Sequence, residues 1–339
     1  MRIGIDGRKI ADFGIGSYIR GLLGGLAGLD EEHEYLVLAP KDAAPLIPPG
    51  IEHVVLEVPH YSLREIISVG RMAERLRLDV FHAPHYVVPI TRTPVVVTIH
   101  DLIHLKMHHR NPLASIYARV MLRRATRVSR IVLTVSEAVR HDISSLLGAE
   151  AEVTPNGIDA AFSPTAPRAV RRPYFFYAGN DKPHKNVGAL LDAFAEVRRE
   201  RPEIELVLAG APFERYRNRD GVLCAGMVRR EELVSLYRGA LALVMPSLEE
   251  GFGMPAAEAM ACGTAVITSV NAALEEVTGD AALHVDARDP AKLAAAMLLV
   301  AADDALRTAL GTAGVERARD FTWSRCAALT LDAYVRAAR

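Results

Sequence analysis

The sequence has few cysteines, little net charge and no long hydrophobic run, and each shortage excludes a class of protein. Only three cysteines occur in 339 residues, and no two of them form a CxxC pair. They supply neither a zinc site nor a disulfide framework, and they are typical of a reducing cytosol. The formal net charge of −1 gives no global field for nucleic acid. We therefore predict a cytoplasmic protein that does not bind nucleic acid.

Segments that cross a membrane or direct secretion are also missing. The start, MRIGIDGRKIADFGIG, lacks the apolar stretch of a signal peptide. The most apolar helical run, residues 293–302, has about half the length of a membrane span. We expect no spanning helix, and at most a peripheral position on the inner face of the membrane.

Short apolar runs alternate with helical stretches along the whole chain. The expected helices include residues 17–29, 63–76, 112–128 and 138–147. The expected strands are residues 2–5, 34–39, 54–58, 80–83, 95–99, 131–135, 174–178, 205–209, 222–225, 241–245, 265–268 and 283–285. Runs of Val, Ile and Leu that alternate with helices indicate α/β units with parallel, doubly wound sheets.

A segment rich in proline and arginine, residues 159–173, interrupts this alternation. The length of the chain also suits two domains of about 150 residues. We therefore predict two Rossmann-like domains, at residues 1–165 and 166–320. Ligands of such sheets bind beyond the carboxyl ends of the strands, so the expected site lies in a cleft that the two sheets face.

The strongest chemical signal is the segment PSLEEGFGMPAAEAMACGT at residues 246–264. An expected strand ends there in a turn whose glycines, Gly251 and Gly253, let the backbone approach a ligand. A helix follows, and the amides at its start form an anion site suited to a diphosphate. Glu250 and Glu258 are placed to accept hydrogen bonds from sugar or ribose hydroxyls. Two solvated glutamates beside a glycine-rich turn explain either feature alone, but not the whole segment.

A second signal, YAGNDKPHKN at residues 177–186, follows the first expected strand of the second half. A lysine held by a proline turn at the carboxyl edge of a sheet can neutralise a leaving diphosphate without a metal ion. Lys185 and Lys182 are the candidates, and Asn180 lies on the same turn. The alternative is that these lysines are solvated surface groups.

Three weaker signals lie in the first half of the chain, each between an expected strand and the helix that follows it. They are Gly14 and Gly16 in FGIGS, His100 with Asp101, and Ser136 with Glu137. A lone glycine-rich loop or histidine is more often structural. For the last pair, capping of the next helix and binding of an acceptor are equally good explanations.

Together these segments resemble the family-four retaining glycosyltransferases of the GT-B fold. The hallmark of that family is two glutamates separated by seven residues around an EGFG-type loop, and Glu250 and Glu258 match it. The resemblance implies that Glu258 holds the ribose hydroxyls of a nucleotide-sugar. It also implies that Glu250 and the amides of Phe252, Gly253 and Met254 hold the donor sugar and its phosphates.

The same resemblance gives roles to the other segments. Lys185 matches the family's phosphate-binding lysine, but Asn180 stands where the family has an arginine, so Lys182 becomes the candidate for a second cation. His100 would contact the donor sugar and act in catalysis with Lys185 and Glu250. The remaining implied contacts are Gly14 and Gly16 with the donor phosphates, Met227 and Val228 with the nucleobase, and Asp101, Ser136 and Glu137 with the acceptor.

The resemblance covers nearly the whole chain and also assigns its ends and junctions. PNGID at residues 155–159 resembles a structural turn at the domain junction, and residues 321–339 resemble a helix that crosses back onto the first domain. Residues 1–165 would then form the acceptor side and residues 166–320 the nucleotide-sugar side. The sequence has no DxD pair of the kind that metal-dependent transferases use. We expect no metal ion and no cofactor besides the nucleotide-sugar substrate.

The expected reaction is transfer of a sugar with retention of configuration to a glycan or lipid-linked acceptor in surface polysaccharide synthesis. The GN-x-KPHKN form of the lysine segment resembles bacterial mannosyltransferases, which favours GDP-mannose over a UDP-sugar as donor. A nucleotide-sugar 2-epimerase and a non-catalytic binding subunit are the alternatives. A nicotinamide dehydrogenase is disfavoured because no GxGxxG follows the first strand.

A basic stretch adds a possible membrane contact. No Asp or Glu occurs between Leu102 and Ser136, whereas arginine is frequent there. The expected helix at residues 112–128 sets an apolar face beside Arg119, Arg123, Arg124 and Arg127. Such a helix suits an anionic membrane surface, and a solvated helix paired with acids elsewhere is an equally good explanation.

Overall fold

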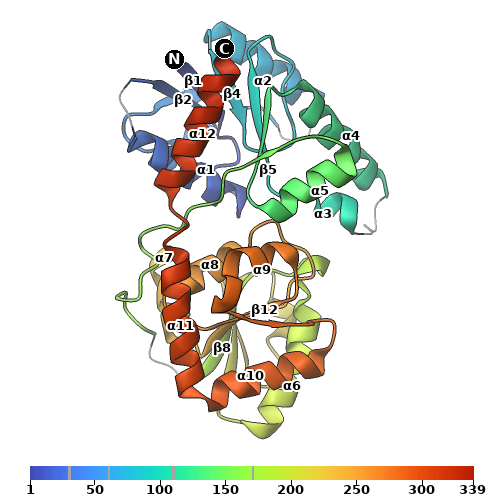
Figure 1. Cartoon of the computed structure of the whole chain (residues 1–339), viewed down its shortest axis with the longest axis vertical. Helices are drawn as coiled ribbons and strands as arrows, with labels where there is room; N and C mark the ends of the chain where they lie inside the picture. The colour runs from blue at the N-terminus through green and yellow to red at the C-terminus, as the bar shows by residue number, and fades with distance from the viewer. Residues whose placement is uncertain (30–31, 60–61, 108–111, 170–171) are drawn as a thin grey trace. The chain divides into compact units, whose positions relative to one another are not determined.

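The computed structural model describes residues 1–29, 32–59, 62–107, 112–169 and 172–339. They form two compact units: Met1–Gly157 with Thr322–Arg339, and Ile158–Phe321. Each unit is a parallel sheet flanked by helices (Figure 1). The predicted α/β fold with two doubly wound, Rossmann-like sheets is confirmed.

The sheet of the first unit has the strand order β3-β2-β1-β4-β5-β6-β7, and all its pairings are parallel. The strands are β1 (Arg2–Asp6), β2 (Glu34–Ala39), β3 (Glu52–Val55), β4 (Val80–Ala83), β5 (Val95–Ile99), β6 (Ile131–Thr134) and β7 (Glu152–Val153). β3 begins earlier than expected. β7 has no counterpart among the expected strands, because two residues are too few to show an apolar pattern.

The helices of the first unit include the C-terminal segment of the chain. They are α1 (Ile15–Ala27), η1 (Lys41–Leu46), α2 (Leu63–Arg75), α3 (Ile103–Lys106), α4 (Pro112–Val128), α5 (Glu137–Leu147) and α12 (Trp323–Ala338). α12 packs along α1 (Figure 1). Glycines on α1 make this approach possible, since a Cβ at Gly21 would lie 2.0 Å from Cε2 of Trp323.

The sheet of the second unit has the order β10-β9-β8-β11-β12-β13 and is also parallel. Its strands are β8 (Tyr174–Asn180), β9 (Glu205–Ala211), β10 (Val222–Gly226), β11 (Ala242–Met245), β12 (Val266–Ser269) and β13 (Leu283–Val285). Its helices are η2 (Pro183–Lys185), α6 (Val187–Glu200), η3 (Glu214–Tyr216), α7 (Arg230–Gly239), α8 (Met254–Ala261), α9 (Ala272–Thr278), η4 (Gly279–Ala281), α10 (Pro290–Ala302) and α11 (Asp304–Ala318).

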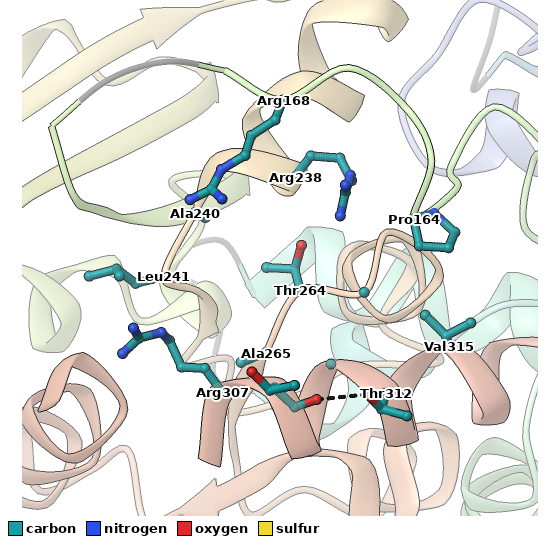
Figure 2. A pocket seen from close by; sticks show the side chains of 13 residues that line it. Pro164, Arg168, Arg238, Ala240, Leu241, Thr264, Ala265, Arg307, Thr312 and Val315 are labelled. Atoms are coloured by element: carbon teal, nitrogen blue, oxygen red, sulfur yellow. Dashed lines mark hydrogen bonds between the residues drawn. The ribbon is translucent and has the colours of Figure 1, made fainter. Parts of the chain in front are cut away.

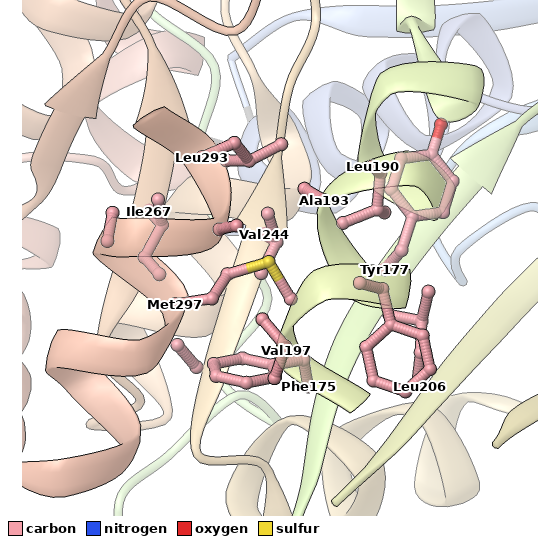
Figure 3. Close-up of a cluster of buried hydrophobic side chains, with 14 of the residues drawn as sticks. Phe175, Tyr177, Leu190, Ala193, Val197, Leu206, Val244, Ile267, Leu293 and Met297 are labelled. Carbon is pink, nitrogen blue, oxygen red and sulfur yellow. The ribbon is translucent and has the colours of Figure 1, made fainter. Parts of the chain in front are cut away.

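The core of the second unit lies between its sheet and helices α6 and α10 (Figure 3). Strand and helix side chains interdigitate there, and each large one contributes about 1.5–3 kcal/mol by burial. Its members include Phe175, Leu206, Val244, Leu190, Val197, Leu293 and Met297. This packed layer fixes the strands whose carboxyl ends carry the predicted site.

The boundary between the units lies at Gly157, ahead of the expected residue 165. The expected linker instead packs onto α7. The Ala169 amide donates a hydrogen bond to the Ser235 carbonyl over 3.0 Å, and Arg238 Nε donates to the Ala166 carbonyl over 3.2 Å. The sequence does not reveal this packing, because it depends on hydrogen bonds to backbone carbonyls and leaves no apolar pattern in the segment.

Candidate functional site

The strand order of the second unit reverses between β8 and β11, and the two strongest sequence signals follow these strands. β8 ends at Asn180 and β11 ends at Met245. In open parallel sheets, ligands bind beyond the carboxyl ends at such a reversal. Both segments therefore lie at the edge of the sheet where a ligand is expected.

Lys185 and Glu250, one from each segment, form an ion pair at this edge. Nζ of Lys185 lies 2.5 Å from Oε1 of Glu250, and their side chains are 16% and 9% exposed. Beside the pair, the Leu248 amide donates to the His184 carbonyl over 2.7 Å and joins the two loops. The pair is neutral as a whole and still reaches solvent. An incoming anion can therefore replace Glu250 as the partner of Lys185.

The loop after β11 presents the start of α8 to the same edge. Gly253 is the N-cap of α8 and has φ 90°, in the left-handed region that favours glycine. No side chain caps this end, so the positive end of the α8 dipole and the Met254 amide can meet an anion. The next amides, those of Ala256 and Ala257, donate to the Gly253 carbonyl. The Phe252 ring is buried edge-on against Phe321, with centroids 5.3 Å apart. The Phe252 ring therefore serves packing, and contact of its amide with the donor stays a prediction.

Two polar side chains, the buried Ser269 and the half-buried Asn271, hold the loop from behind. The Ser269 hydroxyl donates to the Ser247 carbonyl, and Asn271 Nδ2 donates to the Leu248 carbonyl over 3.1 Å. Asn271 Oδ1 also accepts from the first amides of α9. Besides Lys185 and His184, residues of β12 and of the N-cap of α9 therefore hold the loop.

Glu258 lies in the second turn of α8 and is held by Tyr237 of α7. The Tyr237 hydroxyl donates a hydrogen bond to Glu258 Oε2 over 2.8 Å. Burial raises the pKa of Glu258 to about 7, Asp159 adds to the rise, and Tyr237 and Arg230 oppose it. Burial also raises the pKa of Tyr237 well above its usual value, so its hydroxyl remains a donor. Glu258 is therefore poised between its protonated and ionised forms at neutral pH.

Asn180 closes the turn after β8. Its Oδ1 accepts from the Lys182 amide over 3.2 Å, and the Tyr177 hydroxyl donates to its carbonyl over 2.7 Å. The Lys182 side chain is exposed, and its amine has no partner within the described ranges. Its neighbour Asp181 pairs with Arg215. A role of Lys182 as second cation stays a prediction.

Met227 and Val228 follow β10, the outermost strand on this side of the sheet. Gly226 turns the chain with φ 67°, and the Met227 side chain is exposed. Both residues lie on the same carboxyl edge as the Lys185–Glu250 pair. Their contact with a nucleobase stays a prediction.

In the first unit, the two loop glycines have different functions. Gly14 is the N-cap of α1 with φ 59°, and a Cβ there would meet nothing within 4 Å. Gly16 is buried, and a Cβ there would lie 2.6 Å from the Ile10 carbonyl oxygen. Gly14 thus suits an open loop, whereas Gly16 is needed for packing.

His100 follows β5 and is neutral at physiological pH. Its Nε2 donates to the Pro84 carbonyl over 3.1 Å, and its ring lies edge-on to Tyr18. Burial lowers the pKa of His100 to about 4. Since Nε2 carries the proton, Nδ1 holds the lone pair and can accept a hydrogen bond. Asp101 accepts from the Ile103 amide over 3.1 Å and shapes the next turn.

Ser136 and Glu137 are explained by helix capping. The fully buried Ser136 hydroxyl oxygen accepts from the Val139 amide over 3.2 Å at the start of α5. Glu137 pairs with Arg140 across one turn, at 2.5 Å. The capping explanation accounts for Ser136, which is buried, and its contact with an acceptor stays a prediction.

Sequence reasoning missed a cluster of buried charges at the carboxyl end of β1. Nε and Nη2 of Arg8 donate to the two carboxylate oxygens of Asp6 over 2.8 and 2.6 Å, and Nη2 also donates to Glu65 over 2.8 Å. His85 Nε2 lies 3.4 Å from Asp6. Burial raises the pKa of Asp6, but Arg8 and His85 more than offset this and hold it well below its usual range. The DGR triplet after the first strand was the available signal.

Helix α4 carries exposed basic and apolar side chains together. The exposed members are Arg119, Arg123, Arg127, Ile116 and Val120. Arg124 differs from the other arginines, because its guanidinium donates to the carbonyls of Val88 and Pro89. Arg124 is therefore half-buried and bound to these carbonyls, while the other three arginines are exposed. The membrane contact of the four arginines stays a prediction.

Two properties of the molecule bear on membranes and metals. No helix within the described ranges is long and apolar enough to span a bilayer. In the same part of the chain, no three His, Cys, Asp or Glu side chains gather as a metal site.

Comparisons with known proteins identify the family of the chain. The family model "Glycosyltransferase Family 4" matches residues 14–162, and "Glycosyl transferases group 1" matches residues 161–317. The chain is 30% identical to D-inositol 3-phosphate glycosyltransferase of Pseudarthrobacter chlorophenolicus, over 95% of this chain and 90% of that protein. It is 29% identical to O-antigen chain mannosyltransferase B of Escherichia coli, over 75% and 74%.

A solved structure shares the fold over nearly the whole length. Sucrose-phosphate synthase from Thermosynechococcus elongatus superimposes with a TM-score of 0.83 and 20% identity, covering 99% of this chain and 98% of that one. At this identity the likeness concerns the fold alone. Sequence and fold therefore point to the same group of proteins.

Proposed function

The chain belongs to the family-four glycosyltransferases of the GT-B fold, and we propose that it moves a sugar from a nucleotide-sugar to a hydroxyl of a glycan or lipid-linked acceptor. The family makes it a glycosyltransferase of glycan biosynthesis. The observation that carries the proposal is the Lys185–Glu250 ion pair, which lies on one sheet edge with the open start of α8 and with Glu258. A lysine, free amides and two carboxylates match the phosphates and hydroxyls of such a donor.

In this proposal, donor binding divides among these groups. Glu258 accepts hydrogen bonds from the ribose hydroxyls through the oxygen that Tyr237 leaves free. The amides of Gly253 and Met254 hold the diphosphate. Lys185 turns from Glu250 to the phosphates, and Glu250 then accepts from hydroxyls of the donor sugar.

The transfer step needs no covalent intermediate on the protein. The acceptor oxygen bonds to the anomeric carbon on the face that the diphosphate leaves, so the configuration is retained. The carbon–oxygen bond to the diphosphate breaks, and the acceptor proton passes to the leaving phosphate. Lys185 and the α8 amides stabilise the charge that develops there, without a metal ion. Neutral His100 accepts a hydrogen bond from the donor sugar through Nδ1.

We propose GDP-mannose as donor and a surface polysaccharide or its lipid-linked precursor as acceptor. The KPHKN segment and the 29% identity to O-antigen chain mannosyltransferase B support mannose. A UDP-sugar is the second candidate. Calorimetric titration with GDP-mannose, GDP and UDP-sugars tests this choice, and tighter binding of a UDP-sugar would reject GDP-mannose.

Nucleotide release, measured with and without acceptor, separates transfer from its alternatives. We expect GDP release that depends on acceptor and persists in EDTA. A 2-epimerase would release nucleotide without acceptor, and a binding subunit would release none. Loss of activity in EDTA with recovery in Mg²⁺ would refute the metal-independent mechanism.

We also propose that α4 contacts an anionic membrane. Ile116 and Val120 are 59% and 52% exposed, and Arg119, Arg123 and Arg127 follow the same side at four-residue spacing. Each arginine near such a surface contributes about 1 kcal/mol. Wild type should sediment with anionic liposomes, and replacing the three arginines by glutamate should abolish this. Wild type that ignores such liposomes at low salt would end the proposal.

A further inference from the structure

A polar pocket lies in the second unit at the amino ends of the strands, opposite the carboxyl ends that carry Lys185 and Glu250 (Figure 2). Its cavity volume is about 360 Å³, and it opens where β11 and β12 begin, beside Leu241 and Ala265. Lys185 and Glu250 lie beyond the opposite ends of these strands. Four residues at about 3.3 Å each separate the two edges by roughly 13 Å. A ligand in this pocket is therefore separate from the donor.

Three arginines give the pocket a positive charge. Figure 2 shows Arg168, Arg238 and Arg307 around it, and no carboxylate occurs among the described side chains that line it. Arg307 pairs with Asp304 and donates to the carbonyls of Val300 and Ala301. Within the described ranges, Arg168 and Arg238 have no acidic partner. Such a pocket attracts an anion because its cations have little compensating charge nearby.

Two hydrogen bonds fix the guanidinium of Arg238 in the wall of this pocket. Its Nε donates to the Ala166 carbonyl over 3.2 Å and its Nη1 to the Cys262 carbonyl over 3.1 Å. Neither acceptor carries a formal charge, so the guanidinium keeps its full positive charge. Arg168 is exposed and has no partner within the described part of the chain. One fixed and one adaptable guanidinium can hold the oxygens of a phosphate group.

Threonine hydroxyls supply the rest of the polar lining. Thr264 donates to the Tyr237 carbonyl over 2.7 Å, and Thr312 donates to the Thr308 carbonyl over 2.9 Å. Their hydroxyl oxygens keep lone pairs that accept hydrogen bonds from alcohols. Close packing forms the floor, since a Cβ at Gly311 would lie 2.4 Å from the Gly263 carbonyl oxygen. The pocket thus offers donors for phosphate and acceptors for sugar hydroxyls.

We propose that this pocket binds a phosphorylated sugar at a site separate from the donor site. The arginines take the phosphate and the threonines take hydroxyls of the sugar. A cavity of this volume lies in the range of small-ligand sites. The proposal does not depend on which nucleotide-sugar the protein uses.

Calorimetry with mannose 6-phosphate, inorganic phosphate and mannose tests the proposal on the full chain. We compare wild type with Arg168→Gln, the double variant Arg168→Gln/Arg307→Gln, and Lys185→Ala. The matched control is Arg199→Gln, an exposed arginine on α6 outside the pocket. Arg168→Gln should weaken mannose 6-phosphate binding about tenfold, as expected for one lost charge-assisted hydrogen bond. Lys185→Ala and Arg199→Gln should bind like wild type.

The other outcomes reject the proposal. Binding that is unchanged in the double variant, or lost in Lys185→Ala, places the sugar phosphate elsewhere. If inorganic phosphate binds as tightly as mannose 6-phosphate, the pocket does not recognise the sugar. If mannose binds as tightly as mannose 6-phosphate, the pocket does not recognise the phosphate. Absence of binding by all three probes overturns it entirely.

Discussion

Both units carry charged side chains where the strand order of their sheet reverses, but the two sets differ in burial and in the pairing of their charges. In the first unit, Asp6, Arg8, Glu65 and His85 are only 1–5% exposed and bind one another. In the second unit, the Lys185–Glu250 pair reaches solvent, and it faces amides that have no side-chain cap. The first set is closed to ligands, whereas the second can exchange a partner.

The physical consequence differs accordingly. A buried ion pair costs desolvation, and removing one partner leaves an uncompensated charge. A pair near solvent contributes little to stability and can give up one partner to a ligand. We infer that the cluster around Arg8 stabilises the first unit, and we propose that the Lys185–Glu250 pair serves the reaction.

The largest effect should come from breaking the buried cluster. Asp6→Ala removes two acceptors of Arg8 and should lower the free energy of unfolding by about 3–5 kcal/mol. Urea denaturation measures this. Glu34→Ala is the control, because it breaks an exposed ion pair with Arg2 at 2.8 Å and should cost at most about 1 kcal/mol. Equal losses in the two variants would contradict the role of burial.

Breaking the Lys185–Glu250 pair should instead affect catalysis. Lys185→Ala should lower turnover about 10²–10³-fold, because the leaving diphosphate loses its cation. Its unfolding free energy should fall by less than that of Asp6→Ala, because the Lys185–Glu250 pair reaches solvent whereas the cluster around Arg8 does not. Steady-state rates and denaturation of the same samples separate these effects. The control Lys292→Ala, an exposed lysine on α10, should change neither. A variant that is unstable but active would make this pair structural.

The fold and the Lys185 side of this contrast could be predicted from the sequence, whereas the cluster around Arg8 could not, for a physical reason. The EGFG loop and the lysine turn were found because local glycine, proline and strand-end patterns place them at a sheet edge. Arg8 and Glu65 are far apart in sequence, so nothing local shows that they meet. The same holds for Tyr237 and Glu258. The different position of Arg124 could have been predicted, because it does not follow the four-residue spacing of Arg119, Arg123 and Arg127.

The ionisation of Glu258 sharpens the contrast further. Its folded pKa of about 7 lies above the ordinary value of 4.5. If ribose binds the ionised form, GDP affinity should rise up to about tenfold between pH 6 and pH 8. Stability should change in the opposite direction. The folded state favours the protonated form, so the free energy of unfolding falls as pH rises from about 4.5 through 7.

Glu258→Gln isolates this contribution. The variant should bind GDP more weakly by about 1–3 kcal/mol at pH 8, because a carboxylate acceptor is lost. Nucleotide phosphate also titrates near pH 6, and this part of the pH dependence should remain in the variant. Calorimetry at three pH values measures both. A variant with the pH profile and affinity of wild type would remove Glu258 from the nucleotide site.

Substitution of Lys182 tests whether an exposed cation can bind the diphosphate at the carboxyl ends of the strands, beside Lys185. Its stem is long enough to reach the phosphates over Pro183, and its amine has no partner among the described side chains. Lys182→Ala should reduce turnover at least about tenfold, since a second charge on the leaving diphosphate is lost. Adding Asn180→Arg should restore part of the rate. Normal activity of Lys182→Ala, with no gain from the arginine, would show a solvated surface lysine.

The smallest predicted effect concerns the hydroxyl of Tyr237, which stabilises the ionised form of Glu258. Tyr237→Phe keeps the ring but removes this donor, so the pKa of Glu258 should rise by about one unit. At pH 7 fewer carboxylates are then ionised, and GDP affinity should fall about fivefold. Affinity should approach that of wild type at pH 9.

Tyr174→Phe is the matched control, because it removes a buried hydroxyl that donates to the Leu236 carbonyl over 2.7 Å. It should cost similar stability without moving the midpoint of the pH profile. If both variants keep the wild-type midpoint, Tyr237 only packs against α8, and the ionisation of Glu258 is set by burial and by Asp159 and Arg230.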